Sequence, residues 1–291
     1  MTQYRFKLAK GANHVQCPQC GYKRKFKPYV YADTGEVVDA TKWGRCERIN
    51  SCAYNEYPRL NDWELSDWTP PMPKHIPPPT PDYIPKNLVE ASFNQFQSNV
   101  FFKWLVKLFG SDTAYTLQER YNIGTAKGGG TIFWQEDKDG NFRTGKRMFY
   151  NTNGKRKDFM SYIHNDKLIK KHLKKDFTLV QVLFGEHLNK DTDKPIALVE
   201  SEKTAILMSV FEPEYTWIAS GGANMLNHYR LSRLERLDLV SPDNGQFELW
   251  RLQTALFKGR QMDGRVEKAV REGALGEGDD ILDLILKEKG I

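Results

Sequence analysis

The sequence of 291 residues contains no run of eighteen apolar residues, so no segment is predicted to span a membrane. Its first residues, MTQYRFKLAK, lack the apolar region of a secretory signal peptide. We therefore expect a cytoplasmic protein. Internal repeats are also absent, and Gly128-Gly129-Gly130 is not followed by the Gly-Lys-Ser/Thr of a Walker phosphate loop. The glycine triplet is better interpreted as a flexible turn.

Cysteine is absent after residue 52, and the only four cysteines are Cys17, Cys20, Cys46 and Cys52. In a reducing cytoplasm, thiols clustered in a short polar segment are better explained by a metal than by disulfides. Four thiolates suit tetrahedral Zn²⁺, so we expect a structural zinc site. His14 could replace one cysteine as a ligand. Four buried cysteines without a metal are the alternative.

The segment between the two cysteine pairs predicts a β-hairpin. Residues 25–30 and 36–43 have the composition of strands, and Asp33-Thr34-Gly35 between them is a turn signal. Together with the cysteines, this hairpin predicts a zinc β-ribbon over residues 1–68.

Proline is concentrated after the ribbon. Eight of the fourteen prolines lie between Pro70 and Pro85. Such a segment stays extended and semi-rigid, so residues 69–86 are predicted to be a linker. A proline-rich ligand for an SH3-like partner is the alternative.

The remaining composition is that of a folded, basic protein. An apolar fraction of 40% and seven tryptophans can supply cores, which excludes a disordered chain. The formal charge of +6, with a pI near 8.9, favours a polyanionic partner.

Residues 87–190 are predicted to form a small α+β module. Residues 93–109 are apolar and aromatic at helical spacing, which predicts a core helix or helix pair. The glycine triplet leads into a strand at 131–135, and a turn at 139–141 returns the chain through a second strand at 142–150.

Basic residues crowd this second strand and the segment after it. Basic charge beside exposed aromatics is typical of proteins that bind single-stranded nucleic acid. Arginine grips phosphate with two hydrogen bonds, which favours the arginines as contacts. A further lysine run at 167–175 is explained equally well by a solvated helix face. The predicted nucleic-acid contacts are Arg143, Lys146, Arg147 and Arg156.

Two carboxylates follow predicted strands in the last third of the chain. An apolar run at 196–199 ends at Glu200, and a β-prone segment beginning at Leu237 ends at Asp243. Acids at strand ends are what a Mg²⁺ site needs, because this ion takes oxygen ligands. The alternative is that Glu200 is a helix-start acid and Asp243 a turn residue.

Other elements are predicted around these acids. The pattern predicts helices at 204–211 and 231–237 and a strand at 216–219. The acidic tail at 278–284 has the pattern of a capped amphipathic helix with acids in its first turn.

In their order along the chain, Glu200, the Ser220-Gly221-Gly222-Ala223 turn and Asp243 resemble the toprim domain of bacterial replicative primases, topoisomerases and related nucleases. This resemblance implies a Rossmannoid α/β domain over residues 191–291. The acidic tail at 278–284 also resembles the acidic ending of many toprim primase modules, with the capped helix as the alternative. The toprim resemblance also implies catalytic Mg²⁺ held by Glu200 and Asp243, with Lys203 as a phosphate or carboxylate partner. Toprim proteins carry Asp-x-Asp at the second acid, whereas here Gly245 takes the second aspartate's place, so one ligand is missing.

The order of parts is also similar to that of bacterial primases, which begin with a zinc ribbon and place a small sheet before toprim. The resemblance implies an α/β multidomain primase-like protein of a bacterial mobile element. Such a protein would bind single-stranded DNA and nucleotides and make primers by Mg²⁺-dependent nucleotidyl transfer, with a helicase or other replication protein acting in trans. The alternative is a non-catalytic nucleic-acid-binding protein with a degenerate toprim domain. A toprim nuclease fits less well, because such enzymes need not carry the two upstream parts.

Overall fold

The computed structural model shows a mixed α/β protein that divides into two compact units, Met1–Pro77 and Pro78–Ile291. The predicted linker falls mostly outside the described residues, as do Ala223 and Lys174. Within the part described, no helix has the length and apolar character needed to cross a membrane. The structure describes residues 6–10, 14–48, 52, 54–58, 79–173, 175–190, 192–222, 225–276 and 278–291.

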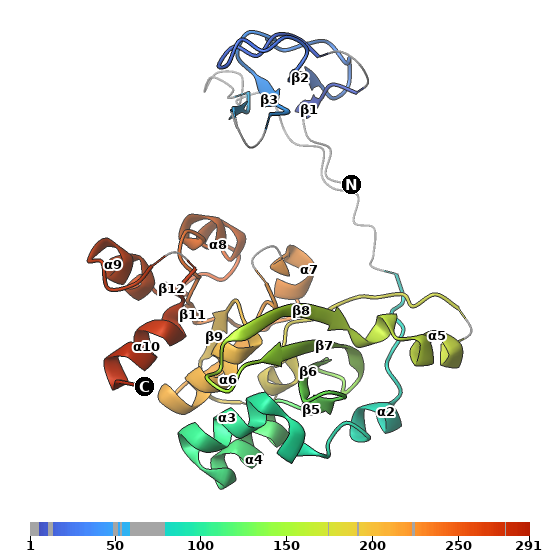
Figure 1. Ribbon diagram of the computed structural model, residues 1–291, viewed down its shortest axis with the longest axis vertical. Helices are drawn as coiled ribbons and strands as arrows, with labels where there is room; N and C mark the ends of the chain where they lie inside the picture. The colour runs from blue at the N-terminus through green and yellow to red at the C-terminus, as the bar shows by residue number, and fades with distance from the viewer. Residues whose placement is uncertain are drawn as a thin grey trace. The chain divides into compact units, whose positions relative to one another are not determined.

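The first unit contains an antiparallel sheet in the order β1-β2-β3-β4 (Figure 1). Its strands are β1 (Phe6–Leu8), β2 (Phe26–Tyr31), β3 (Gly44–Cys46) and β4 (Asn55–Glu56). Alternate residues of β2 are buried, as expected for a strand with one covered face.

The hairpin of this unit differs from the prediction in its second strand. The turn after β2 forms as expected, with Gly35 at a φ of 75°. Residues 36–43 are not a strand, because Asp39 holds them in a turn: its carboxylate accepts the Thr41 N–H and its carbonyl accepts the Trp43 N–H. After the turn, the chain forms a continuous strand pairing with β2 only at β3.

The second unit begins with helices and an antiparallel sheet in the order β5-β6-β7-β8 (Figure 1). The strands are β5 (Ile123–Ala126), β6 (Gly130–Glu136), β7 (Phe142–Tyr150) and β8 (Arg156–Tyr162). The helices around them are α2 (Lys86–Glu90), α3 (Val100–Phe109), α4 (Ser111–Arg120) and α5 (Lys167–Leu173). The predicted strands at 131–135 and 142–150 are confirmed as β6 and β7, and the glycine triplet makes the turn before β6.

The aromatic helix starts later than predicted. Residues 93–99 contain only a short 3₁₀ turn, and α3 begins at Val100 because Asn99 caps it by accepting the Phe102 N–H. Gly110, with a φ of 82°, separates α3 from α4, so a helix pair is present but shifted.

The rest of the chain builds a parallel sheet in the order β10-β9-β11-β12. Its strands are β9 (Ile196–Val199), β10 (Thr216–Ala219), β11 (Leu239–Val240) and β12 (Gln261–Met262). The helices are α6 (Glu202–Phe211), α7 (His228–Leu231), α8 (Phe247–Gln253), α9 (Arg265–Arg271) and α10 (Ile281–Lys289). The helix predicted at 231–237 is wrong: α7 ends at Leu231, where its predicted start lay, because Asn227 caps it early.

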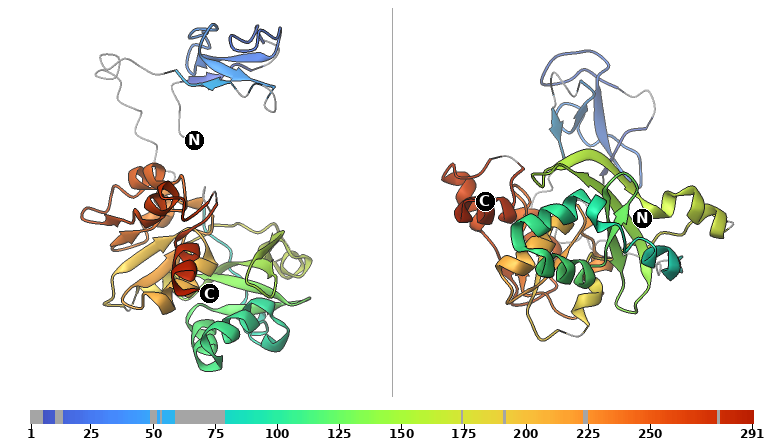
Figure 2. Two further views of the ribbon diagram at one scale, coloured as in Figure 1. Left: turned by 60° about the vertical axis from the view of Figure 1, so that its left-hand side comes forward. Right: turned by 60° about the horizontal axis from the view of Figure 1, so that its bottom comes forward.

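Both faces of the parallel sheet are covered, since every residue of β9 and β10 is buried. One face shares a core with α3, α4 and the antiparallel sheet, so the two sheets lie side by side (Figure 2). Tyr121, fully buried after α4, stacks on Phe184 and donates its hydroxyl to the Trp217 carbonyl of β10 at 3.0 Å. This shared core fixes the antiparallel sheet against the ends of the parallel strands.

Candidate functional site

The four cysteines of the first unit come together as predicted. Their sulfur atoms all lie within 4.8 Å of one another, with Cys17 to Cys52 at 3.9 Å and Cys20 to Cys46 at 4.0 Å. A tetrahedral zinc with Zn–S bonds of about 2.3 Å needs sulfur–sulfur distances of about 3.8 Å. The four thiols therefore fit a structural Zn²⁺. Elsewhere in the described residues, no other group of three such ligands comes as close.

His14 is not part of this cluster, because its Nε2 lies 2.9 Å from the Glu47 carboxylate. The pKa of Cys20 is lowered to about 6 by the backbone N–H of Tyr22, whereas burial raises the pKa of Cys46 to about 12. The core of the unit is small: besides the cysteines, its cluster centres on Phe26. Zinc would supply the cohesion that so small a core cannot.

In the second unit, four parallel strands end at one edge with polar residues. Glu200 follows β9, Ser220 follows β10, Asp243 lies three residues after β11, and Asp263 follows β12. The carboxyl ends of parallel strands are where open α/β sheets bind ligands. Asp263 was not predicted, because a two-residue strand gives almost no sequence signal; it is held by Ser241 and Arg265.

Asp243 is the most strongly perturbed acid at this edge. Burial raises its pKa to about 8, and the negative charges of Asp280, Glu200 and Asp283 and a hydrogen bond with Glu200 add to the effect. The structure thus brings Glu200 and Asp243 together. A cation would relieve this crowding of carboxylates, which is the physical reason for considering Mg²⁺ here.

Asp280 and Asp283 also have a structural role at the start of α10. Asp280 accepts the N–H groups of Leu282 and Asp283, and Asp283 accepts the N–H of Asp280, which makes a capping box. The capped-helix interpretation of the acidic tail is confirmed. The negative charges of these two acids also act on Asp243. Lys203 lies close enough to Asp283 for its charge to favour that carboxylate, lowering a pKa that burial raises.

A cleft of about 460 Å³ lies between the two sheets of this unit. One wall comes from β7 and β8 and includes Lys146 and Arg156; the other comes from the strand-end turns and includes Glu200, Ser201 and Gly221. The cleft therefore places an acidic edge opposite a basic wall.

Lys146 crosses between the two walls. Its ammonium donates to the Glu202 carboxylate at 3.0 Å and to the Gly221 carbonyl at 2.9 Å. The side chains of Lys146 and Glu202 are both buried. Sequence analysis missed Glu202, although its place at the first turn of α6 could have indicated a role. Arg156 is exposed and forms no ion pair with any residue that the structure describes, so its guanidinium is open to the cleft.

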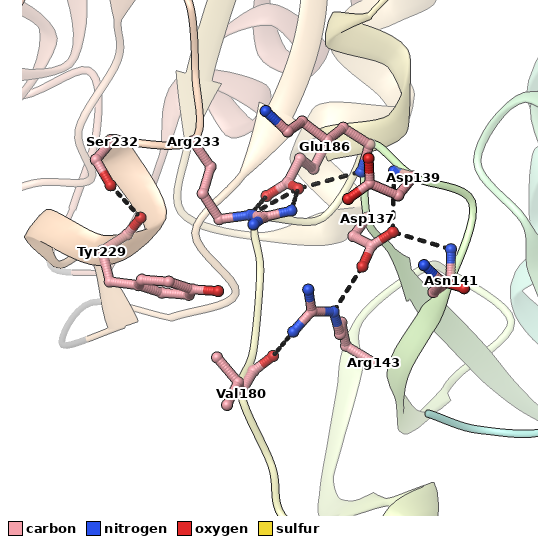
Figure 3. Close-up of polar contacts among 10 residues, drawn as sticks. Asp137, Asp139, Asn141, Arg143, Val180, Glu186, Tyr229, Ser232 and Arg233 are labelled. Atoms are coloured by element: carbon pink, nitrogen blue, oxygen red, sulfur yellow. Dashed lines mark hydrogen bonds and ion pairs between the residues drawn. The ribbon is translucent and has the colours of Figure 1, made fainter. Parts of the chain in front are cut away.

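The other two predicted nucleic-acid contacts, Arg143 and Arg147, do not line the cleft. Arg143 is buried; it donates to the Asp137 carboxylate at 2.7 Å and to the Val180 carbonyl, beside the Glu186–Arg233 pair (Figure 3).

Arg147 lies on the face of the sheet opposite Lys146, since neighbouring residues of β7 alternate there, and it is paired with Asp166 at 2.5 Å. Lys146 and Arg156 are thus brought together with Glu200, whereas Arg143 and Arg147 are not.

Comparison with known proteins gives two family matches. The family described as a domain of unknown function (DUF6371) matches residues 99–244, which is half of the chain. A zinc beta-ribbon finger family matches residues 4–63, so the prediction of an N-terminal zinc ribbon is confirmed. No curated protein matches the chain.

Two solved structures from bacteriophage T7 are similar to this chain. The primase fragment of its primase-helicase protein is 14% identical over 90% of this chain and 95% of that one, with a TM-score of 0.35. A structure of its lagging-strand DNA polymerase with primase domains is 16% identical over 60% and 81%, with a TM-score of 0.30.

Proposed function

From the premise that the chain belongs to the family described as a domain of unknown function (DUF6371), we propose that it is a primase-like replication protein of a bacterial mobile element. It would bind single-stranded DNA and synthesise primers by Mg²⁺-dependent nucleotidyl transfer. The observation that carries the proposal is the cleft, in which Glu200 from a parallel strand end faces Lys146 and Arg156 from the antiparallel sheet.

Each wall of the cleft has a chemical task in this proposal. Glu200 and Asp243 would hold Mg²⁺, which would neutralise phosphate charge when bound. No third carboxylate lies close enough to complete a preformed site among the described residues, so the affinity would be low until a phosphate completes the ligand shell.

The two basic residues of the cleft wall, Lys146 and Arg156, have different roles in this proposal. Arg156 is exposed and can donate two hydrogen bonds to a phosphate. Lys146 is already satisfied by Glu202 and Gly221, so its main task is to hold the two walls at a fixed spacing. The protein is expected to act in the cytoplasm, with the zinc ribbon engaging template DNA and a helicase or other replication protein acting in trans.

A second candidate is a non-catalytic nucleic-acid-binding protein. Gly245, at the position of the second toprim aspartate, favours it, because no carboxylate can come from that residue. Gly245 has a φ of 80°, a conformation in which an aspartate is strained.

A primer-synthesis assay separates the two candidates. Purified protein is incubated with single-stranded DNA, ribonucleotides and Mg²⁺, with EDTA as the control. The first candidate predicts short oligonucleotides that depend on Mg²⁺. DNA binding without any product would leave only the second.

A further inference from the structure

The antiparallel sheet has a second accessible face, on the side away from the cleft. We call it the outer face and define it by Arg147 and Phe149 of β7 and Phe159 and Ser161 of β8. Arg147 donates to the Ser161 hydroxyl at 3.1 Å, and the rings of Phe149 and Phe159 lie 5.6 Å apart, so these residues share one side of the sheet.

A groove of about 590 Å³ opens on this outer face, between α2 and α5. Two of its apolar side chains are unusually exposed: Phe159 by 58% and Leu168 by 61%. Exposed apolar surface gathered in a groove indicates a binding site rather than a fold requirement. The lining includes Leu88, Trp134, Phe149, Phe159, Leu168 and Ile169.

Two polar side chains of the groove, those of Trp134 and Arg147, are already used within the protein. The Trp134 indole donates to Ser92 at 2.9 Å, and Arg147 is held by Asp166 and Ser161. The groove therefore offers a ligand flat apolar contact and little hydrogen-bond recognition. That is the chemistry of base stacking that tolerates any sequence.

The charge around the groove favours an anion. The acid Asp166 is neutralised by Arg147, whereas Lys127 in the lining and Lys157 of β8 form no ion pair with any residue in the described part of the chain. Helix α5 adds three more lysines, Lys167, Lys170 and Lys171. Two adjacent aromatic rings with unpaired lysines beside them suit bases and phosphates better than they suit the side chains of a peptide.

We propose that this outer face is a second binding surface for single-stranded DNA, with bases stacking on Phe159 and Phe149 and phosphates contacting Lys127 and Lys157. Strand β8 is the edge of its sheet, so its two faces meet at one border. Arg156 on the cleft side and Phe159 on the outer side lie three residues apart on that strand. A single strand would cross this edge between the groove and the cleft. The proposal rests on the DNA binding of the proposed function and assigns it a second contact.

The test measures binding of a labelled oligothymidylate of about 20 nucleotides by fluorescence anisotropy, over a range of salt concentrations. Phe159→Ala should weaken binding about five-fold to about a hundred-fold, because a base–aromatic stack is worth about 1–3 kcal/mol. The slope of affinity against salt should not change, because no charge is lost. Phe159→Trp should restore the affinity, and Lys157→Ala should instead lower the slope by about 0.7.

Leu252→Ala is the matched control, because Leu252 is an apolar residue of α8 that is 63% exposed and lies outside the groove. It should bind as the wild type does. Phe159→Ala with wild-type affinity, or an equal loss in Leu252→Ala, would overturn the proposal and leave the groove to another ligand, such as a protein. Wild-type protein that binds no oligothymidylate would remove the proposed function as well. Primer synthesis with no effect of Phe159→Ala on binding would remove only this inference.

Discussion

Replacing Asp243 by asparagine is expected to stabilise the protein while removing a proposed magnesium ligand. The pKa of Asp243 is raised from an ordinary value of 3.8 to about 8 by burial and by the charges of Asp280, Glu200 and Asp283. Near neutral pH the folded protein therefore holds a proton that the unfolded chain has released, which lowers the free energy of unfolding. Asparagine has no charge to desolvate, and its amide can still donate a hydrogen bond to Glu200.

The two pKa values set the size and sign of this effect. Each pH unit above 3.8 lowers the free energy of unfolding by about 1.4 kcal/mol, so the upper limit of the loss near pH 7 is about 4 kcal/mol. Because the site is not completely buried, we expect about 2–4 kcal/mol. A pKa that is higher in the folded state means that stability is greatest below about pH 4 and falls as the pH rises towards about 8. Asp243→Asn should abolish this fall.

Urea unfolding followed by tryptophan fluorescence, without Mg²⁺, measures the effect. The midpoint for Asp243→Asn should exceed that of the wild type at about pH 8 and equal it at about pH 4. The exposed control Glu214→Gln should change neither midpoint. Equal midpoints for Asp243→Asn and wild type at the higher pH would refute the description of Asp243 as a buried carboxyl crowded by negative charge.

Three further outcomes follow from the structure. Purified protein should contain one zinc per chain, and Cys46→Ser should lose it, as measured by elemental analysis; unchanged zinc content would contradict the four-cysteine site. Arg156→Ala should weaken binding to single-stranded DNA and lower its salt slope by about 0.7, whereas the exposed control Arg236→Ala should not; an unchanged slope would place the phosphates elsewhere. Gly245→Asp should cost about 1–2 kcal/mol in urea unfolding because of its left-handed backbone, and should strengthen Mg²⁺ binding in calorimetry; unchanged Mg²⁺ affinity would show that the residue does not face the ion.

The sequence predicted those elements whose signal is local. Strand β10 has the predicted bounds because Thr216–Ala219 is a short apolar run before a glycine turn, and Glu200 was placed at a strand end by the apolar run before it. Start and stop signals were harder to read: Asn99 and Asn227 cap helices at positions where the apolar pattern alone predicted other bounds.

The roles of the basic residues on β7 could not be predicted from their positions. Lys146 pairs with Glu202, fifty-six residues away in sequence, and Arg143 is buried against Asp137 and Val180. A single sequence does not show which of two alternating faces meets a partner from a distant segment. Alanine at Arg143 or Lys146 would therefore test the fold rather than DNA binding, because each leaves a buried carboxylate unpaired.

Primer synthesis by Glu200→Gln tests most directly whether the strand-end acids carry nucleotidyl transfer. We expect wild-type protein to make Mg²⁺-dependent primers, and Glu200→Gln to make none yet bind single-stranded DNA nearly as well. The control Glu214→Gln, at an exposed site, should retain both properties. Primer synthesis at the wild-type rate by Glu200→Gln, or no primer synthesis by the wild type under conditions where it binds DNA, would show that these acids do not carry nucleotidyl transfer.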